Sequence, residues 1–256
     1  MNSLDLAVIG NGSFSALLNR EGRIGWSCLP RFDGDPTFCT LLDGGNSDRA
    51  FGFFDIALEG FERAEQRYLR NTAIVETTLY DGNGGAVEIV DFAPRFRQLD
   101  RTYRPVMIVR RIRPKTGAPR ISIRLRPATD YGRKPAETTH GSNHIRYIIP
   151  DCPMRVTTDA PVSLVLEEVP FVLDRTHTLV FGPDETLASG VDNVGRDFLE
   201  RTADYWKGWT RGLSLPFEWQ DEVIRAAITL KLCAFEETGA VIAGLRAFLS
   251  PLELQR

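Results

Sequence analysis

The sequence predicts a mainly β fold, an antiparallel β-sandwich followed by a short C-terminal helical segment. Three observations support this class. Short apolar runs separated by turn residues fill residues 1–190 of the 256-residue chain. Long helical patterns do not alternate with these runs, so βαβ units are not expected. Beyond residue 190 the spacing of the apolar residues becomes helical.

The composition excludes several classes of protein. Hydrophobic residues make up 43% and charged residues 25% of the chain, which is typical of a globular protein and not of collagen, a coiled coil or a disordered chain. The net charge is -3, with 31 basic and 34 acidic residues interleaved, so no nucleic-acid partner is expected. No apolar run has the length of a membrane span and no signal peptide is evident, so we expect a cytoplasmic protein without membrane contact.

The first predicted elements are two short strands at residues 4–9 and 14–18, separated by Gly10-Asn11-Gly12. A third strand is expected at 23–28, and a loop rich in turn formers follows at 29–36. Residues 37–42 are expected to form a short helical turn.

The middle of the chain continues as strands. Residues 73–80 alternate, with Val75, Thr77 and Leu79 on one face, and a Gly-rich loop leads into a strand at 86–92, which together indicate a hairpin. Further strands are predicted at 106–112, 121–125, 145–149, 162–166, 171–173 and 178–181.

Two helices are predicted after residue 190. The first, at 194–209, carries apolar residues at helical spacing, and the second, at 217–235, is apolar around most of its circumference. We therefore expect a sandwich domain over 1–190, a helical segment over 191–243 and a divergent tail over 244–256. Because exposed apolar side chains promote association, the 217–235 helix should pack on the sandwich or mediate self-association.

Several motifs have simpler interpretations than a cofactor or metal site. Gly10-Asn11-Gly12 resembles the start of a dinucleotide fingerprint, but the segment after it is too short for the required helix, so a hairpin turn is favoured. His140 and His144 lie in a turn-like stretch, which favours a solvated loop over a metal site. The four cysteines lack ligand spacing and are expected to be packed, reduced thiols. No cofactor and no metal is therefore expected.

Acidic pairs occur at 33/35, 167/168 and 236/237. Glycoside hydrolysis needs two carboxylates that face each other across a bond. Adjacent residues on a strand point to opposite faces, so Glu167 and Glu168 do not form such a pair. Glu236 and Glu237 are interpreted as solvated charges at a helix end, and no catalytic pair is predicted.

The loop that follows the third strand has the most functional character. Trp26, Arg31, Phe32 and Asp33 combine aromatic rings, a planar cation and a carboxylate. Such groups stack on sugar rings and hydrogen-bond their hydroxyls, so these four residues are candidates for a carbohydrate or interdomain contact. The alternative is a buried Trp26 with an Arg31–Asp33 pair that fixes the loop.

An ordered series of sequence blocks resembles bacterial glycoside hydrolase family 15, which includes glucoamylase-like and trehalase-like enzymes. The blocks are residues 9–12, 16–17, 22–33, 38, 41–42, 68–69, 71–72, 76–77, 87–94, 126–127, 131–132, 202, 205–206, 209, 223–232 and 238–243. The resemblance covers residues 4 to 243, and the order and spacing of the blocks make it specific.

This resemblance implies an N-terminal antiparallel β-supersandwich, a helical linker and the opening of an α/α barrel. The family inverts the anomeric centre of α-glucosides with two glutamates that lie in the barrel, so neither is carried over to this chain. After Ala243 the resemblance is lost in the sequence GLRAFLSPLELQR, which indicates a frameshift or a premature stop.

The leading interpretation is a non-catalytic N-terminal domain of a family-15-type protein without hydrolase activity alone. One alternative is a stand-alone α-glucan-binding or assembly module that uses an exposed Trp26 loop or a sheet face. Another is a hydrolase subunit completed by a separately encoded barrel.

Overall fold

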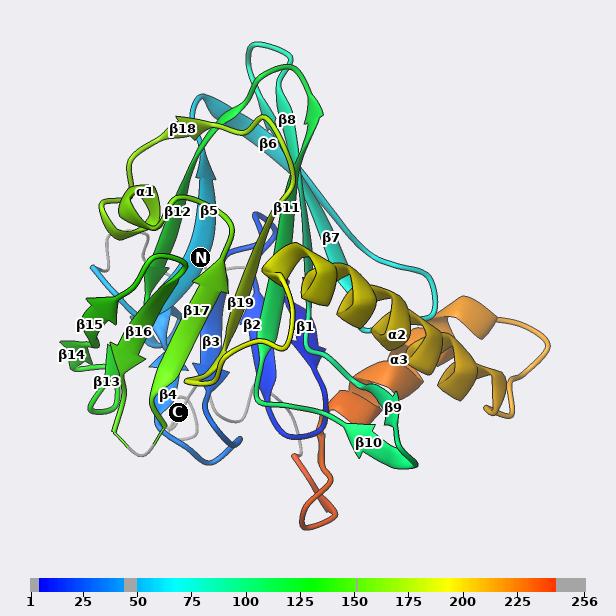
Figure 1. The fold of residues 1–256 in the computed structure, drawn as a ribbon. Helices are drawn as coiled ribbons and strands as arrows, with labels where there is room; N and C mark the ends of the chain where they lie inside the picture. The colour runs from blue at the N-terminus through cyan, green and yellow to red at the C-terminus, as the bar shows by residue number, and fades with distance from the viewer. Residues whose placement is uncertain (1–4, 44–49, 151, 243–256) are drawn as a thin grey trace, which may run out of the picture.

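Two large antiparallel sheets pack face to face in the computed structural model, which describes residues 5–43, 50–150 and 152–242 (Figure 1). The seven-stranded first sheet has the order β1 (Ala7–Gly10), β2 (Ser15–Leu18), β3 (Ile24–Cys28), β5 (Phe53–Leu58), β12 (Arg120–Arg126), β18 (Phe171–Val172), with β4 (Pro36–Phe38) paired to β3. The eight-stranded second sheet has the order β15 (Glu137–His140), β16 (His144–Ile148), β17 (Met154–Thr158), β19 (His177–Pro183), β11 (Ile108–Thr116), β8 (Ala86–Phe92), β7 (Val75–Asp81), β6 (Phe61–Tyr68). The predicted antiparallel sandwich is therefore confirmed.

The remaining elements are short ribbons and helices. The ribbons are β9 (Phe96–Gln98) with β10 (Arg101–Tyr103), β13 (Ala128–Thr129) with β14 (Lys134–Pro135), and β20 (Ala234–Phe235) with β21 (Ala240–Val241). The helices are the 3-10 turn η1 (Thr40–Asp43), α1 (Val162–Leu166), α2 (Val191–Arg211) and α3 (Gln220–Leu232).

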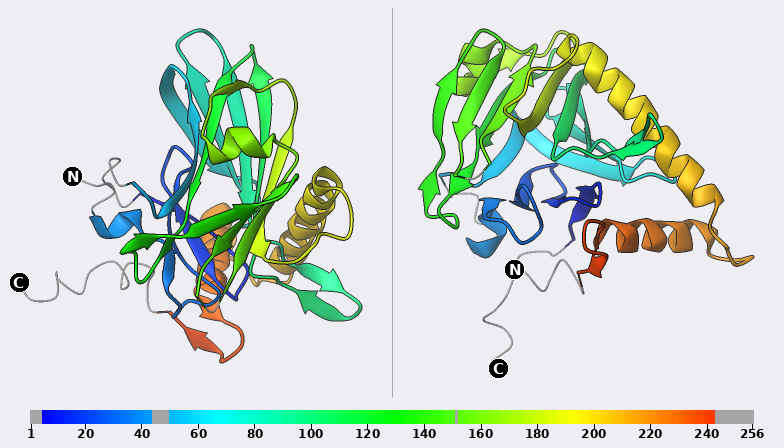
Figure 2. Two further views of the ribbon diagram at one scale, coloured as in Figure 1. Left: turned by 60° about the vertical axis from the view of Figure 1, so that its left-hand side comes forward. Right: turned by 60° about the horizontal axis from the view of Figure 1, so that its bottom comes forward.

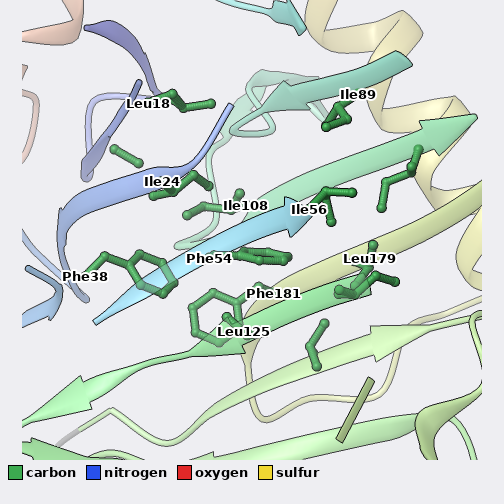
Figure 3. Close-up of a cluster of buried hydrophobic side chains, with 14 of the residues drawn as sticks. Leu18, Ile24, Phe38, Phe54, Ile56, Ile89, Ile108, Leu125, Leu179 and Phe181 are labelled. Carbon is green, nitrogen blue, oxygen red and sulfur yellow. The ribbon is translucent and has the colours of Figure 1, made fainter. Parts of the chain in front are cut away.

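The main core lies between the two sheets. Figure 3 shows Phe54 of the first sheet close to Phe181 of the second, and their ring centroids are 6.5 Å apart. Side chains alternate along each strand, so Val75 and Leu79 of β7 enter this core as predicted. Burial of these side chains is the main driving force that holds the two sheets together.

Helix α2 covers the outer face of the second sheet (Figures 1 and 2). Val90 and Phe92 of β8 point away from the main core and pack in a cluster with Phe198 of α2. Because both faces of β8 are covered, all seven of its residues are buried, which explains its nearly continuous apolar sequence.

Helix α3 packs against β1 at the edge of the first sheet. Ile224, Ile228 and Leu232 recur along one side of this helix and join Trp26 and Trp206 in a second apolar cluster. The side of this helix that carries Ile228 therefore packs on the sandwich, as expected.

Some predicted elements differ from the structure. Residues 162–166, predicted as a strand, form helix α1, where Val162 and Val165 are buried one turn apart. A short apolar run does not distinguish a strand from a buried helical turn, and Pro161 starts the turn. The 217–235 helix is shorter than predicted, because Trp219 has a left-handed φ of 62° at the N-cap and the chain turns into β20 after Cys233.

The segment predicted as a helical turn, residues 37–42, is helical only in its second half. Strand β4 first extends the first sheet, and η1 begins after it, at Thr40. Strands β5, β6, β15 and β17 were not predicted. The predicted tail at 244–256 lies outside the described residues. Within the described ranges, no helix combines the length and the apolar character needed to cross a membrane.

Candidate functional site

The loop after β3 meets the segment that follows α3. The guanidinium of Arg31 lies 5.0 Å from the ring centroid of Phe235, and the Phe32 ring packs edge-on to the same ring at 5.8 Å. Arg31 also donates from Nε to Oδ1 of Asp33 over 3.1 Å, and both side chains are exposed. The loop therefore contacts β20 of the C-terminal segment.

Trp26 does not form part of an exposed surface. It is only 7% exposed and packs in the second apolar cluster with Trp206 and Ile228. The expectation of an exposed Trp26 loop is wrong for the indole itself, because the indole is buried in an apolar cluster that includes side chains of α2 and α3. Of the four predicted residues, Arg31, Phe32 and Asp33 lie together in the loop, and Trp26 lies in the preceding strand β3.

A cluster of charged residues joins the turn between β1 and β2 to the end of α3, and we call it the Glu236 cluster (Glu236, Arg95, Arg104 and Lys231). Oε1 of Glu236 accepts from Nη2 of Arg95 at 2.6 Å and from Nζ of Lys231 at 3.1 Å. Nε of Arg104 lies 3.7 Å from Oε2. Glu236 is thus held by three cations from three separate parts of the chain.

Gly12 lies directly against this cluster. The Glu236 backbone N–H donates to the Gly12 carbonyl over 3.0 Å, and Gly12 has a φ of 84°. A Cβ at this position would lie 3.1 Å from the Glu236 carboxyl carbon and 3.0 Å from Arg95 Nη1. Position 12 therefore requires glycine for both its conformation and its close neighbours.

Asn11 connects the same turn to the two segments that flank the β9–β10 hairpin. Its buried side chain donates to the carbonyls of Pro94 at 3.1 Å and Pro105 at 2.6 Å. Arg95 in turn donates to the Asn11 carbonyl, and its guanidinium lies 4.8 Å from the Tyr205 ring centroid on α2. The Gly10-Asn11-Gly12 motif is therefore a hairpin turn, as favoured above, and it organises the junction between the sandwich and the helices.

The charge state of Glu236 follows from this environment. Burial opposes ionisation of the carboxyl, but hydrogen bonds and charge from Arg95 and Lys231 outweigh it and lower the pKa of Glu236. The interpretation of Glu236 as a solvated charge is wrong, whereas Glu237 is exposed as expected. Nothing in the local sequence signals the Glu236 contacts, because its cationic partners Arg95 and Arg104 lie more than a hundred residues away.

The other acidic candidates have structural partners. Glu168 forms a bidentate pair with Arg126, with both N–O distances at 2.6 Å, and the Asp35 carboxylate accepts from the Tyr131 backbone N–H at 2.8 Å. These interactions fix loops and leave neither carboxylate free for acid–base chemistry.

The histidines and cysteines also have structural environments. His140 and His144 flank the turn of the β15–β16 hairpin, and within the described ranges no group of three His, Cys, Asp or Glu side chains could hold a metal. Cys28, Cys39, Cys152 and Cys233 are all free thiols. Burial, with nearby negative charge, raises the pKa of Cys28 to about 12, so this thiol is unreactive.

The junction described above lies in a chain that is similar to trehalases. Relatives include a trehalase of Thermoplasma volcanium, 27% identical over 94% of this chain, and a trehalase of Mycolicibacterium smegmatis, 23% identical over 93%. Trehalase 1 of Sulfolobus acidocaldarius is 28% identical over 93% of the chain. The chain spans about 39% of the length of each of these relatives.

A family profile accounts for the sandwich itself. The profile described as trehalase-like, N-terminal matches residues 4–168, which include all but the last strands of both large sheets. The match extends over more than half of the chain and agrees with its β-rich fold. The chain belongs to the trehalase-like N-terminal family.

Proposed function

We propose that this chain is the non-catalytic β-sandwich part of a glycoside hydrolase of family 15, that it acts as a docking platform for a catalytic α/α barrel, and that it does not hydrolyse glycosides by itself. The observation that carries this proposal is that α3 has two apolar faces and uses only one of them on the sandwich.

The two faces of α3 follow from helical spacing. Ile224, Ile228 and Leu232 form the inner face, and all three are at most 7% exposed. Ala226 and Leu230 lie on the opposite side of the helix, and Trp219 is the N-cap residue just before it; we call these three residues the α3 outer face. Trp219 is 72% exposed and Leu230 is 67% exposed.

Large exposed apolar side chains at helical spacing are typical of a surface that binds another protein element. A helical barrel is the occupant that best fits this face, because helices pack through such stripes of side chains. The similarity to trehalases continues through α3, and those relatives are about two and a half times as long as this chain, which spans 39% of them. A barrel docked on the α3 outer face is consistent with that length.

The Glu236 cluster supports the same proposal at its other end. It fixes the segment after α3 to the β1–β2 turn, while Arg31 and Phe32 contact Phe235. These contacts give the junction a defined geometry, which a platform for a second domain requires.

The unpaired cysteines support a cytoplasmic location for the protein. None of the four cysteines, all of which lie among the described residues, forms a disulfide, and unpaired thiols are typical of cytoplasmic proteins. We therefore propose a cytoplasmic protein.

The test combines hydrolysis and docking. The purified chain is incubated with trehalose and with maltose, and glucose release is followed against a buffer blank; no release is expected. The separately expressed barrel part of the Thermoplasma volcanium trehalase is then mixed with the chain and analysed by size-exclusion chromatography. A complex is expected with the wild type and not with the Trp219→Ser/Leu230→Ser variant.

An exposed double variant on α1 and β6, Ser163→Ala/Glu62→Ala, is the matched control and should retain the complex. Hydrolysis by the chain alone that is abolished by a single Glu→Gln change would contradict the non-catalytic assignment.

A further inference from the structure

We propose that a pocket between α2, the β9–β10 hairpin and the outer face of the second sheet binds a neutral saccharide of one or two rings. This pocket does not include the loop or the Glu236 cluster described above, and the inference does not rest on the proposed docking function. Its volume of about 510 Å³ lies within the range of small-molecule sites.

The pocket forms where α2 leaves part of the sheet uncovered. Residues of the N-terminal half of α2, of the loop between β19 and α2, and of strands β17 and β19 line its walls, and Gln98 and Tyr103 of the β9–β10 hairpin line one side. Its polar lining residues include Gln98, Tyr103, Arg155, Glu185, Asp197 and Arg201. Apolar surface comes from Met107 and Phe198, so the lining combines hydrogen-bonding groups with an apolar wall.

Both cations that line the pocket already have carboxylate partners. Arg201 donates from Nη1 to Oδ2 of Asp197 at 3.2 Å, and Nη1 of Arg155 lies 3.8 Å from Oδ1 of Asp184. Nε of Arg155 also donates to Oγ1 of Thr157 at 3.1 Å. Because each cation has a carboxylate partner, the pocket offers little net attraction to a phosphate or another anion.

A metal ligand is also disfavoured. Glu185 and Asp197 are the carboxylates that line the pocket, and the described part of the chain contains no cluster of three metal-ligating side chains. Two carboxylates, one of them paired with Arg201, are a poor cation site.

The Tyr103 ring is fixed by aromatic packing, but its hydroxyl has no hydrogen-bond partner among the described residues. Its ring packs on Phe96 at a centroid distance of 4.9 Å and on Phe198 at 5.7 Å. Among the described residues, none forms a hydrogen bond with the Tyr103 hydroxyl, the Gln98 amide or the Glu185 carboxylate, and all three line the pocket. Burial and the nearby Glu185 raise the pKa of Tyr103, so the hydroxyl keeps its proton.

These free groups match the chemistry of a sugar. A hydroxyl, an amide and a carboxylate provide both donors and acceptors, and each sugar hydroxyl also donates and accepts. The C–H face of a sugar ring is apolar and fits the Met107–Phe198 wall. A neutral saccharide therefore provides hydrogen-bond partners for the free polar groups without adding charge to the pocket.

The test measures binding by isothermal titration calorimetry with the full chain and trehalose or maltose as probes. We expect a Kd of about 1–10 mM, as for a small polar ligand in a preformed pocket. Ser189→Trp should weaken binding at least about tenfold, because the exposed Ser189 lines the pocket and the new indole fills it. Tyr103→Phe should weaken binding about two- to tenfold through loss of one hydrogen bond.

Ser163→Trp on α1 is the matched control, since Ser163 is equally exposed and lies outside this pocket; it should bind like the wild type. Inorganic phosphate is titrated in parallel and should not compete. No binding of either disaccharide, binding that Ser189→Trp leaves unchanged, or competition by phosphate would each overturn the proposal. The hydrolysis and docking tests above do not involve this pocket, so failure of the proposed function and failure of the saccharide proposal can be distinguished.

Discussion

At the residue scale, the buried pair of Arg110 and Asp91 links the two sheets. Neither side chain is exposed, and two hydrogen bonds of 2.7 and 2.9 Å join them. Arg110 also donates to the Phe54 carbonyl of the first sheet at 2.9 Å. A buried charge that loses its partner is strongly destabilising, whereas an apolar pair of similar volume is tolerated.

We therefore predict that Arg110→Met lowers the free energy of unfolding by about 3–5 kcal/mol, because it leaves Asp91 buried without a partner. The Asp91→Leu/Arg110→Met double variant should recover most of this loss. Urea unfolding followed by circular dichroism measures both. Arg63→Met, which breaks an exposed pair with Glu65, is the control and should leave the urea unfolding midpoint close to that of the wild type. A double variant no more stable than the single one would contradict the prediction.

Glu236 gives a pH-dependent prediction at the same scale. Its pKa is lowered in the folded chain, so its contribution to stability is present above its ordinary value of 4.5 and is lost as pH falls through the folded pKa. Unfolding midpoints in urea between pH 3 and pH 7 should therefore drop more steeply for the wild type than for Glu236→Gln at the acidic end. Glu237→Gln, at an exposed position, should follow the wild-type curve. Parallel curves for wild type and Glu236→Gln would show that the cluster does not stabilise the folded state.

At the element scale, the attachment of α3 depends on its inner face. Ile228 is 1% exposed, and its loss should leave a cavity beside Trp26 and Trp206. We predict that Ile228→Ala lowers the free energy of unfolding by about 2–5 kcal/mol. Leu230→Ala on the outer face should change it by less than about 0.5 kcal/mol, because Leu230 is exposed and both residues favour helices.

Tryptophan fluorescence during urea unfolding distinguishes these two variants, since Trp26 and Trp206 lie in the cluster that contains Ile228 and Trp209 packs against it. Equal losses for Ile228→Ala and Leu230→Ala would mean that α3 does not dock through the face described.

The elements also show which secondary structure can be predicted from sequence patterns. The alternation in β7 and the helical spacing in α2 predict their elements, because each pattern repeats several times on one face. Helix α1 was mistaken for a strand because its five residues span little more than one turn. Strand β6 lacks a recognisable pattern because it is an edge strand whose side chains are mostly charged and exposed.

The candidate site was only partly predictable for a different reason. The Gly10-Asn11-Gly12 turn is a local feature, so the sequence indicates it directly. The Glu236 cluster depends on the meeting of the turn, the segment after β8 and the end of α3, which only the tertiary fold brings together. The residue type of Trp26 makes it a candidate, but its burial in a cluster with side chains of α2 and α3 is set by the tertiary fold.

At the scale of the whole molecule, the α3 outer face determines how the chain behaves alone. Trp219 and Leu230 leave an apolar stripe in water, and burying one such side chain contributes about 1.5–3 kcal/mol. We predict concentration-dependent self-association of the purified chain in analytical ultracentrifugation, since a second copy can cover the stripe. Trp219→Ser/Leu230→Ser should shift the chain to monomer without lowering its unfolding midpoint, because neither residue belongs to an apolar cluster of the core. A wild-type chain that stays monomeric at all concentrations would mean that the stripe is too small to associate with itself. Such a chain would then need a larger complementary surface, as a barrel provides, to cover α3.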